Sequence, residues 1–232
     1  MRIHRFYLNT PISGSKFDVP DRDLVHQWRS VFRYNVGSQV ILFDGSGTDY
    51  LCMITLLTNA SATVEVVEEL DGGEKPKVSL TLCMALIKKD NFELVVEKVT
   101  ELGVSRIIPI LCERSEKKNL NMERLQKIVV EASEQSGRGS VPAISDIVDL
   151  QELLQEGNLP EKKLLLHLDG KYIRDAVDEN DEEVSIFIGP EGGWSENELK
   201  VFETFNIPAV SLGSQVLRAE TAAISATSLL LL

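Results

Sequence analysis

The amino-acid sequence predicts an α/β protein in which a small all-β domain is followed by a larger domain with a mostly parallel sheet. Short strand-like segments separated by turns fill residues 1–70, which is the spacing of a small barrel or sandwich. Strand and helix patterns alternate over residues 78–232, which is typical of a parallel sheet covered by helices on both faces. A polar cluster rich in glycine and proline, residues 71–77, is predicted to link the two domains.

One helix and three strands are predicted in the first domain. The helix covers Leu24–Phe32 and leads through Arg33–Gly37 into the first of the three strands. Asp44–Gly47 and Thr58–Ala60 carry the turn residues that divide the strands. The predicted strands are Gln39–Phe43, Tyr50–Thr55 and Ala62–Val67.

In the second domain, helices alternate with five strands. The helix over Asn91–Leu102 is predicted to begin after Asp90, with Glu93 three residues on as in a capping box. Met122–Ser136 places apolar residues at helical spacing and is predicted to be an amphipathic helix. The predicted strands are Val78–Leu86, Arg106–Leu111, Lys163–Leu168, Val184–Ile188 and Ala209–Leu212.

Composition argues against several classes of protein. The sequence contains no apolar run of about 18 residues and no signal peptide, which predicts a soluble, cytoplasmic protein without a membrane partner. The three cysteines, Cys52, Cys83 and Cys112, have no C-x-x-C spacing, and the chain has only three histidines. We therefore expect neither a disulfide framework nor a metal site.

The net charge of −12 argues at first sight against a polyanionic partner. The acidity is local, however, because residues 141–186 contain twelve acidic residues against four basic ones. Elsewhere the charges are closer to balance, so a basic face for nucleic acid is compatible with the sequence.

Two glycine turns at strand ends indicate a cofactor site. The strand Val184–Ile188 opens into Gly189–Gly193, and Ser195 with Glu198 then forms a capping box at the start of a helix. The strand Pro208–Leu212 similarly ends at Gly213, before a helix start at Leu217–Ala223. Glycines let a ligand approach the backbone closely, and loops of this kind can face each other across a crevice at the strand ends. The spacing of these glycines is not that of the G-x-G-x-x-G dinucleotide fingerprint.

The two loops together resemble the RsmE family of the SPOUT methyltransferases, the 16S ribosomal RNA (uracil(1498)-N(3))-methyltransferases. The resemblance covers nearly the whole chain and departs at Trp194, where the family usually has phenylalanine, and in the short C-terminal end. The segments that carry it are His4–Phe6, Lys98–Val104, Glu131–Arg138, Gly189–Gly193, Leu212–Gly213 and Leu217–Ala222.

Membership of this family implies a PUA-like RNA-binding barrel followed by a SPOUT domain whose C-terminal segment forms a trefoil knot. It also implies a homodimer that uses S-adenosyl-L-methionine as methyl donor and acts on 16S ribosomal RNA in the small ribosomal subunit.

The resemblance implies that the cofactor lies among glycine turns and apolar walls at the ends of three strands, with the protein supplying orientation and electrostatics. No P-loop lysine is needed, because S-adenosylmethionine carries no phosphate. The implied cofactor-binding residues are Leu166, His167, Ile188, Gly189, Pro190, Glu191, Gly193, Leu212, Gly213, Val216, Leu217 and Thr221.

For the chemistry, Arg218 is the first candidate, because a cation stabilises the charge that spreads onto the uracil carbonyls as N3 loses its proton. Glu191 and Glu220 are candidate general bases or cofactor ligands, although a carboxylate at a helix N-terminus also stabilises the helix. The residues assigned to RNA binding by the resemblance are Arg5, Arg33 and Arg138.

Two other functions are compatible with parts of the sequence. One is a non-catalytic RNA-binding protein whose α/β half only dimerises, although a scaffold would not need open glycine loops. The other is a nucleotide-dependent oxidoreductase, which the absent dinucleotide fingerprint disfavours.

Overall fold

The computed structural model of the 232-residue chain describes residues 3–73, 76–156, 158–178 and 180–232. The chain forms two compact units. The first comprises Met1–Glu74 and Ser133–Val141, and the second comprises Lys75–Ala132 and Pro142–Leu232. The sequence predicts residues 133–141 in the second domain, but hydrogen bonds to the N-terminal strands tie them into the first unit.

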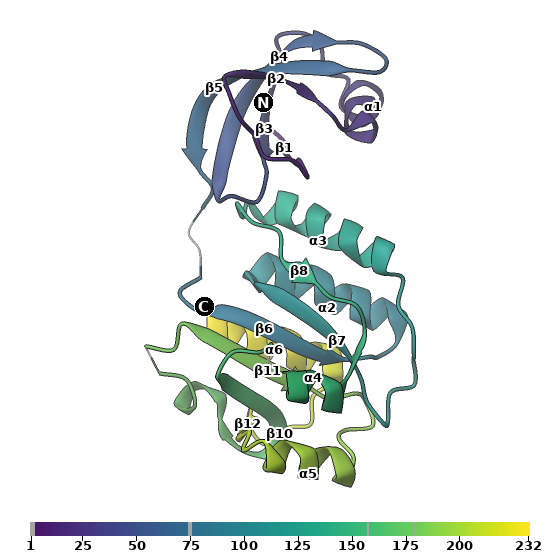
Figure 1. Ribbon diagram of the computed structural model, residues 1–232, viewed down its shortest axis with the longest axis vertical. Coiled ribbons are helices and arrows are strands. Elements are labelled where there is room, and N and C mark those ends of the chain that lie inside the picture. Colours follow the sequence, from purple (N-terminus) through teal and green to yellow (C-terminus); the bar gives the residue numbers. More distant parts are fainter. Residues whose placement is uncertain (1–2, 74–75, 157, 179) are drawn as a thin grey trace. The chain divides into compact units, whose positions relative to one another are not determined.

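A five-stranded sheet, helix α1 (Arg22–Ser30) and the segment of residues 133–141 form the first unit. The strand order is β1-β3-β4-β5-β2, and all neighbours are antiparallel except β1 and β3, which run parallel (Figure 1). Three of the five strands and the helix are predicted by the sequence, whereas the first two strands are not. The strands are β1 (Arg5–Tyr7), β2 (Lys16–Val19), β3 (Gln39–Phe43), β4 (Thr48–Leu57) and β5 (Ala62–Asp71).

Helix α1 contributes the centre of the first core. Asp21 caps the helix by accepting hydrogen bonds from the backbone N–H groups of Asp23 and Leu24 at 2.9 and 3.0 Å, which explains why α1 begins two residues before the predicted start. Its buried side chains include Val25 and Trp28, which are fully inaccessible to solvent. They pack with buried residues of the sheet into one apolar cluster.

The sheet of the second unit is seven-stranded and entirely parallel, which confirms the predicted mostly parallel sheet. Its order is β12-β10-β11-β6-β7-β8, with β9 also paired to β7. The strands are β6 (Ser79–Ala85), β7 (Arg106–Leu111), β8 (Ala143–Ile144), β9 (Val148–Asp149), β10 (Lys162–Tyr172), β11 (Glu183–Ile188) and β12 (Ala209–Ser211). The helices that follow β6 in the chain are α2 (Lys89–Leu102), α3 (Met122–Ser136), α4 (Leu150–Glu156), the short η1 (Ile173–Asp175), α5 (Glu196–Thr204) and α6 (Ala219–Leu231).

Helices cover both faces of this sheet. Helices α2 and α6 pack against each other, and α6 also contacts β6 and β11. Helices α4 and α5 pack on the opposite face, where side chains of α4, Phe187 and Phe202 join one apolar cluster. In Figure 1, α4 lies in front of the sheet and α6 behind it. Within the described ranges, no helix combines the length and the apolar character needed to cross a membrane.

Strand β10 leaves its regular pairing with β12 over residues 167–170. Leu166 and Lys171 both pair with Val210, so the chain makes an excursion between these two positions. Gly170 lies directly against β12, because a Cβ added to it would stand 2.4 Å from the backbone N and C atoms of Val210. Only glycine allows such an approach of two backbones.

Helix α2 begins differently from the prediction. The expected N-cap was Asp90, but the helix starts at Lys89 and its N-cap is Lys88, which makes no side-chain capping bond. Asp90 lies inside the first turn, where its charge still favours the helix dipole.

Candidate active site

The carboxyl ends of the strands lie along one edge of the parallel sheet. Strands β11 and β12 flank β10, so the loops that follow them leave the sheet on either side of β10. In open parallel sheets, ligands bind at this edge. The residues assigned to the cofactor belong to these three strands or follow them directly: Leu166 and His167 on β10, Ile188, Gly189, Pro190, Glu191 and Gly193 at the end of β11, and Leu212, Gly213, Val216, Leu217 and Thr221 after β12.

A tight turn forms the loop after β11. The N–H of Gly193 donates to Pro190 O at 2.9 Å, and Gly193 has φ +68°, a left-handed conformation that favours glycine. No atom lies within 4 Å of the position that a Cβ of Gly193 would occupy. The predicted capping box follows and is confirmed: Ser195 Oγ accepts from Glu198 N at 3.1 Å, and Glu198 Oε2 accepts from Ser195 N at 2.7 Å.

Glu191 connects this loop to helix α2. Its Oε1 accepts a hydrogen bond from the backbone N–H of Lys88 at 3.3 Å. Lys88 is the N-cap of α2, so a carboxylate 103 residues away in sequence supplies the negative charge that a helix N-terminus favours. This contact gives Glu191 a structural role beside its predicted catalytic one.

Arg114, which the sequence analysis did not single out, holds the same loop from another side. Its Nη1 donates to Gly192 O at 2.9 Å and to Trp194 O at 3.1 Å. The neighbouring Glu113 reinforces the contact, because its N–H donates to Glu198 Oε1 at 2.9 Å. In the sequence, Arg114 stands in a polar run after β7, and nothing local indicates a partner 78 residues later.

Trp194 ties the loop to β10. Its Nε1 donates to Leu166 O at 3.2 Å, and its ring packs edge-on against Phe202, with ring centroids 4.9 Å apart. The phenylalanine that the family usually carries could make the ring contact but not the hydrogen bond. Trp194 therefore links β10 to the loop after β11.

The loop after β12 is more open. Gly213 has φ +115° and, like Gly193, has no atom within 4 Å of a Cβ position. Val216 in this loop is 80% exposed. Helix α6 begins after Arg218, whose carbonyl accepts the N–H of Ala222 at 2.8 Å.

Two of the predicted catalytic residues, Arg218 and Glu220, lie beside each other at the start of α6. The side chain of Arg218 is 85% exposed, and its Nη1 lies 4.0 Å from Glu220 Oε1. Because the guanidinium stands in solvent and the distance is long, this ion pair contributes less than about 1 kcal/mol and leaves the guanidinium available to another anionic group. Glu220 is buried, and its Oε2 is enclosed without a hydrogen-bond partner among the described residues.

His167 and Thr221 complete the predicted set. His167 is half-buried, and its Nδ1 accepts the backbone N–H of Asp169 at 3.3 Å, which leaves Nε2 as the proton-bearing nitrogen of the neutral ring. Thr221 is exposed in the first turn of α6. The described residues contain no group of three or more side chains suited to hold a metal ion.

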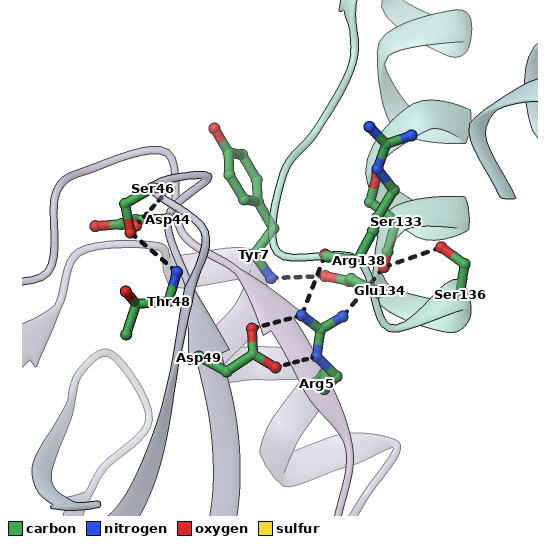
Figure 2. A network of polar contacts seen from close by, with 10 residues as sticks. All are labelled: Arg5, Tyr7, Asp44, Ser46, Thr48, Asp49, Ser133, Glu134, Ser136 and Arg138. Carbon is green, nitrogen blue, oxygen red and sulfur yellow. Dashed lines mark hydrogen bonds and ion pairs between the residues drawn. The ribbon is translucent and has the colours of Figure 1, made fainter. Parts of the chain in front are cut away.

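All three arginines assigned to RNA lie in the first unit. Arg33 is exposed and adopts a left-handed backbone conformation with φ 55°. Arg138 is half-buried, and its Nη2 donates to Ser140 Oγ at 3.2 Å. Burial lowers the pKa of Arg138 to about 10, so it remains a cation at neutral pH. Arg5 lies inside the unit, in the polar network of Figure 2.

Comparison with known proteins identifies the family. The RNA methyltransferase domain family matches residues 74–231, and the RNA methyltransferase PUA domain family matches residues 29–67. A ribosomal RNA small subunit methyltransferase E from Rickettsia conorii is 33% identical over 97% of this chain and 94% of its own length. The chain belongs to the methyltransferase E (RsmE) family. The resemblance inferred from the sequence is thereby confirmed, as is the N-terminal PUA domain.

Two solved structures share the fold over nearly the whole chain. A ribosomal RNA small subunit methyltransferase E from Neisseria gonorrhoeae, bound to S-adenosyl methionine, superimposes with a TM-score of 0.88 at 30% identity and covers 98% of this chain and 96% of its own. A Legionella pneumophila protein in complex with the same cofactor has a TM-score of 0.88 at 29% identity and covers 99% and 97%.

Proposed function

We propose that this protein transfers a methyl group from S-adenosylmethionine to N3 of a uridine in the 16S ribosomal RNA of the small subunit. The observation that carries the proposal is the pair of loops after β11 and β12, which flank β10 at the carboxyl edge of the sheet. Membership of the methyltransferase E family supports the substrate class. The choice of uridine 1498 rests on the family resemblance alone.

The residues at this edge fit the cofactor. Gly193 and Gly213 hold left-handed backbone conformations with open space where a side chain would stand, so a ligand can contact their backbones. Leu212 and Leu217 are partly exposed and supply apolar surface in the loop after β12, whereas Ile188 is buried at the end of β11. The bound cofactor provides an electrophilic methyl group, and the protein's task is to orient that group toward the base.

Arg218 is proposed to stabilise the charge that develops on the uracil carbonyls. Its guanidinium is exposed at the start of α6, next to the loop of Gly213, and Glu220 Oε1 lies within 4.0 Å to orient it. The enclosed Oε2 of Glu220 is poorly placed to take a proton from a base. Glu191 is exposed, so we propose it as the carboxylate that receives the N3 proton while also binding α2.

We also propose for this chain the RNA binding, the homodimer and the knot that the family resemblance implies. The first unit binds the RNA, with Arg33 as an exposed contact. The protein acts as a homodimer. The family resemblance also implies that the C-terminal segment of the second unit threads a trefoil knot, and we include the knot in the proposal on that ground alone.

Methyl transfer to small ribosomal subunits tests the function. Purified protein is incubated with subunits that lack the modification and with S-adenosylmethionine labelled in its methyl group, and the digested RNA is analysed by mass spectrometry. We expect 3-methyluridine at a single position. Methylation of another atom or base, or RNA binding without transfer, would refute the proposed reaction.

Replacing Arg218 tests its role separately. Arg218→Ala should lower kcat at saturating RNA by a hundredfold or more, on the order expected for a lost transition-state donor, with cofactor affinity unchanged. The matched control is Arg174→Ala, which removes an exposed arginine of the same unit from the short helix after β10. If Arg218→Ala keeps full turnover, Arg218 has no part in the chemical step.

A further inference from the structure

The side chain of Arg5 is committed to contacts inside the first unit. Its Nε and Nη2 donate to the two carboxylate oxygens of Asp49 at 2.7 and 2.6 Å, the bidentate geometry of a strong arginine–carboxylate pair. The exposed fractions of the two side chains are only 11% and 8%. The guanidinium also lies 4.3 Å from the centre of the Phe43 ring. A cation enclosed in this way has little surface left for an RNA phosphate.

The remaining contacts of Arg5 reach the segment of residues 133–141. Its Nη1 donates to Ser133 O, and its Nη2 to Arg138 O, each at 3.2 Å. Ser133 lies in the last turn of α3, where carbonyl groups lack helical partners and favour a cation. Figure 2 shows the guanidinium of Arg5 between Asp49 and these two carbonyls. The side chain of Arg5 thus joins the strands of the first unit to both ends of the turn between Ser133 and Arg138.

Two further contacts attach the same segment. Glu134 Oε1 accepts the backbone N–H of Tyr7 at 2.9 Å, and the N–H of Gly47 donates to Gly139 O at 3.2 Å. The backbones of Gly72 and Gly139 touch, because a Cβ added to Gly139 would lie 2.8 Å from Gly72 O. These contacts lie at strand β1, at the turn before β4 and after β5, so the segment is attached along its length.

We propose that Arg5 is a positioning residue for RNA binding, which holds residues 133–141 on the N-terminal sheet so that Gln135 and Arg138 form part of the RNA-binding surface. Gln135 is exposed at the end of α3, and Figure 2 shows the Arg138 guanidinium pointing away from Arg5. The inference rests on the proposed function, since it assumes that the first unit binds RNA. In this arrangement Arg5 acts through the segment and not through a phosphate.

Hydrogen exchange tests the positioning role without RNA. The exchange of amides in residues 133–141 is measured by mass spectrometry in the wild-type protein, Arg5→Ala, Arg5→Lys and Asp49→Asn. Each variant should raise the exchange rates of this segment at least tenfold, because lysine lacks the planar fork and asparagine lacks the charge. Arg22→Ala, an exposed arginine at the start of α1, is the control and should leave them unchanged.

RNA binding as a function of salt distinguishes positioning from direct contact. Arg5→Ala and Asp49→Asn should both weaken binding to small-subunit RNA on the order of tenfold, with the slope of log affinity against log salt unchanged. A direct phosphate contact predicts instead that Arg5→Ala lowers the slope by about one and that Asp49→Asn, which removes a negative charge, does not weaken binding.

The outcomes separate the two proposals. Unchanged exchange over residues 133–141 in the variants, or the direct-contact pattern in the salt series, overturns the positioning role of Arg5. Failure of the wild-type protein to bind RNA overturns the proposed function of the first unit, and the inference with it. If Arg5→Ala does not fold, the nearly isosteric Asp49→Asn decides, since it breaks the same pair.

Discussion

Arg114 illustrates how much of the site depends on single residues distant in sequence. One guanidinium nitrogen holds two carbonyl groups of the loop after β11, and hydrogen bonds from a charged donor are each worth about 1.5–3 kcal/mol when well formed. Solvent reduces this value at an exposed site such as that of Arg114. The sequence offers no signal for the contact, because its polar neighbours are equally typical of a surface loop.

Removing the Arg114 side chain should loosen the cofactor loop. Arg114→Ala is expected to weaken S-adenosylmethionine binding about tenfold, or about 1.4 kcal/mol, because the loop must then become ordered on binding. Lys117→Ala removes an exposed cation of the same connection and serves as control. Isothermal titration calorimetry measures both. Equal affinities of Arg114→Ala and the wild type would contradict a clamping role.

The buried thiol of Cys52 should make the first unit sensitive to alkali. Burial raises its pKa from 9.0 to about 12, because the charged thiolate is excluded from the core. Its contribution to stability is complete below pH 9 and is lost between pH 9 and 12, since the unfolded thiol ionises first.

Urea denaturation at pH 7 to 10.5 tests the effect of Cys52. The free energy of unfolding should fall more steeply above pH 9 in the wild type than in Cys52→Ala. Cys83 and Cys112 are also buried and are present in both proteins, so they cancel in the comparison. Parallel pH profiles would show that Cys52 is not the group responsible.

Helices and strands whose bounds depend on residues close together in the chain were predictable from the sequence. Those whose bounds depend on contacts with residues far away in the chain were not. The capping box of Ser195 and the long strands follow from residues close together in the chain. The start of α2 does not, because its capping carboxylate, Glu191, comes from a loop 103 residues later. Strand β1 has only three residues, too few for a periodic pattern, and exists because β3 pairs with it.

The glycine loop after β11 can be tested as an element. Gly193→Val should weaken S-adenosylmethionine binding more than tenfold, on the scale of a few kcal/mol that a misplaced branched side chain costs. Gly14→Val is the matched control: Gly14 has φ +81° and equally open surroundings, but it lies in the first unit. Both variants bear similar backbone strain, so calorimetry with a thermal melt separates strain from lost binding. Normal affinity in a folded Gly193→Val would remove Gly193 from the site.

At the scale of the whole molecule, the two-domain organisation was predictable and its discontinuity was not. The turn residues at 71–77 mark a boundary in the sequence, and the unit division lies within that range. Residues 133–141 belong to the first unit because of contacts with Arg5, Tyr7 and Gly47, which lie far earlier in the chain. The partners of that segment appear only when the N-terminal strands are folded.

The quaternary state is a prediction for the whole molecule. Helix α6 buries Ala222, Ala226 and Leu230 within its own unit, while Ile224 and Leu229 remain only half-buried. We expect these apolar residues to contact a second copy of the chain. Light scattering should give twice the 25.8 kDa chain mass at micromolar concentration, and Leu229→Asp should shift the protein toward the monomer. A wild-type monomer under these conditions would contradict the dimer.

The strand order of the second unit has a consequence for synthesis on the ribosome. Strand β6 lies between β7 and β11, but β11 follows β6 by about a hundred residues. At translation rates of roughly 5 to 20 residues per second, one edge of β6 waits about 5 to 20 s for its partner. During that interval a strand that is almost wholly buried in the finished protein, with Leu80, Leu82 and Met84 along it, is open to pairing with other nascent chains. Chaperone protection in this window should therefore raise the yield of folded protein.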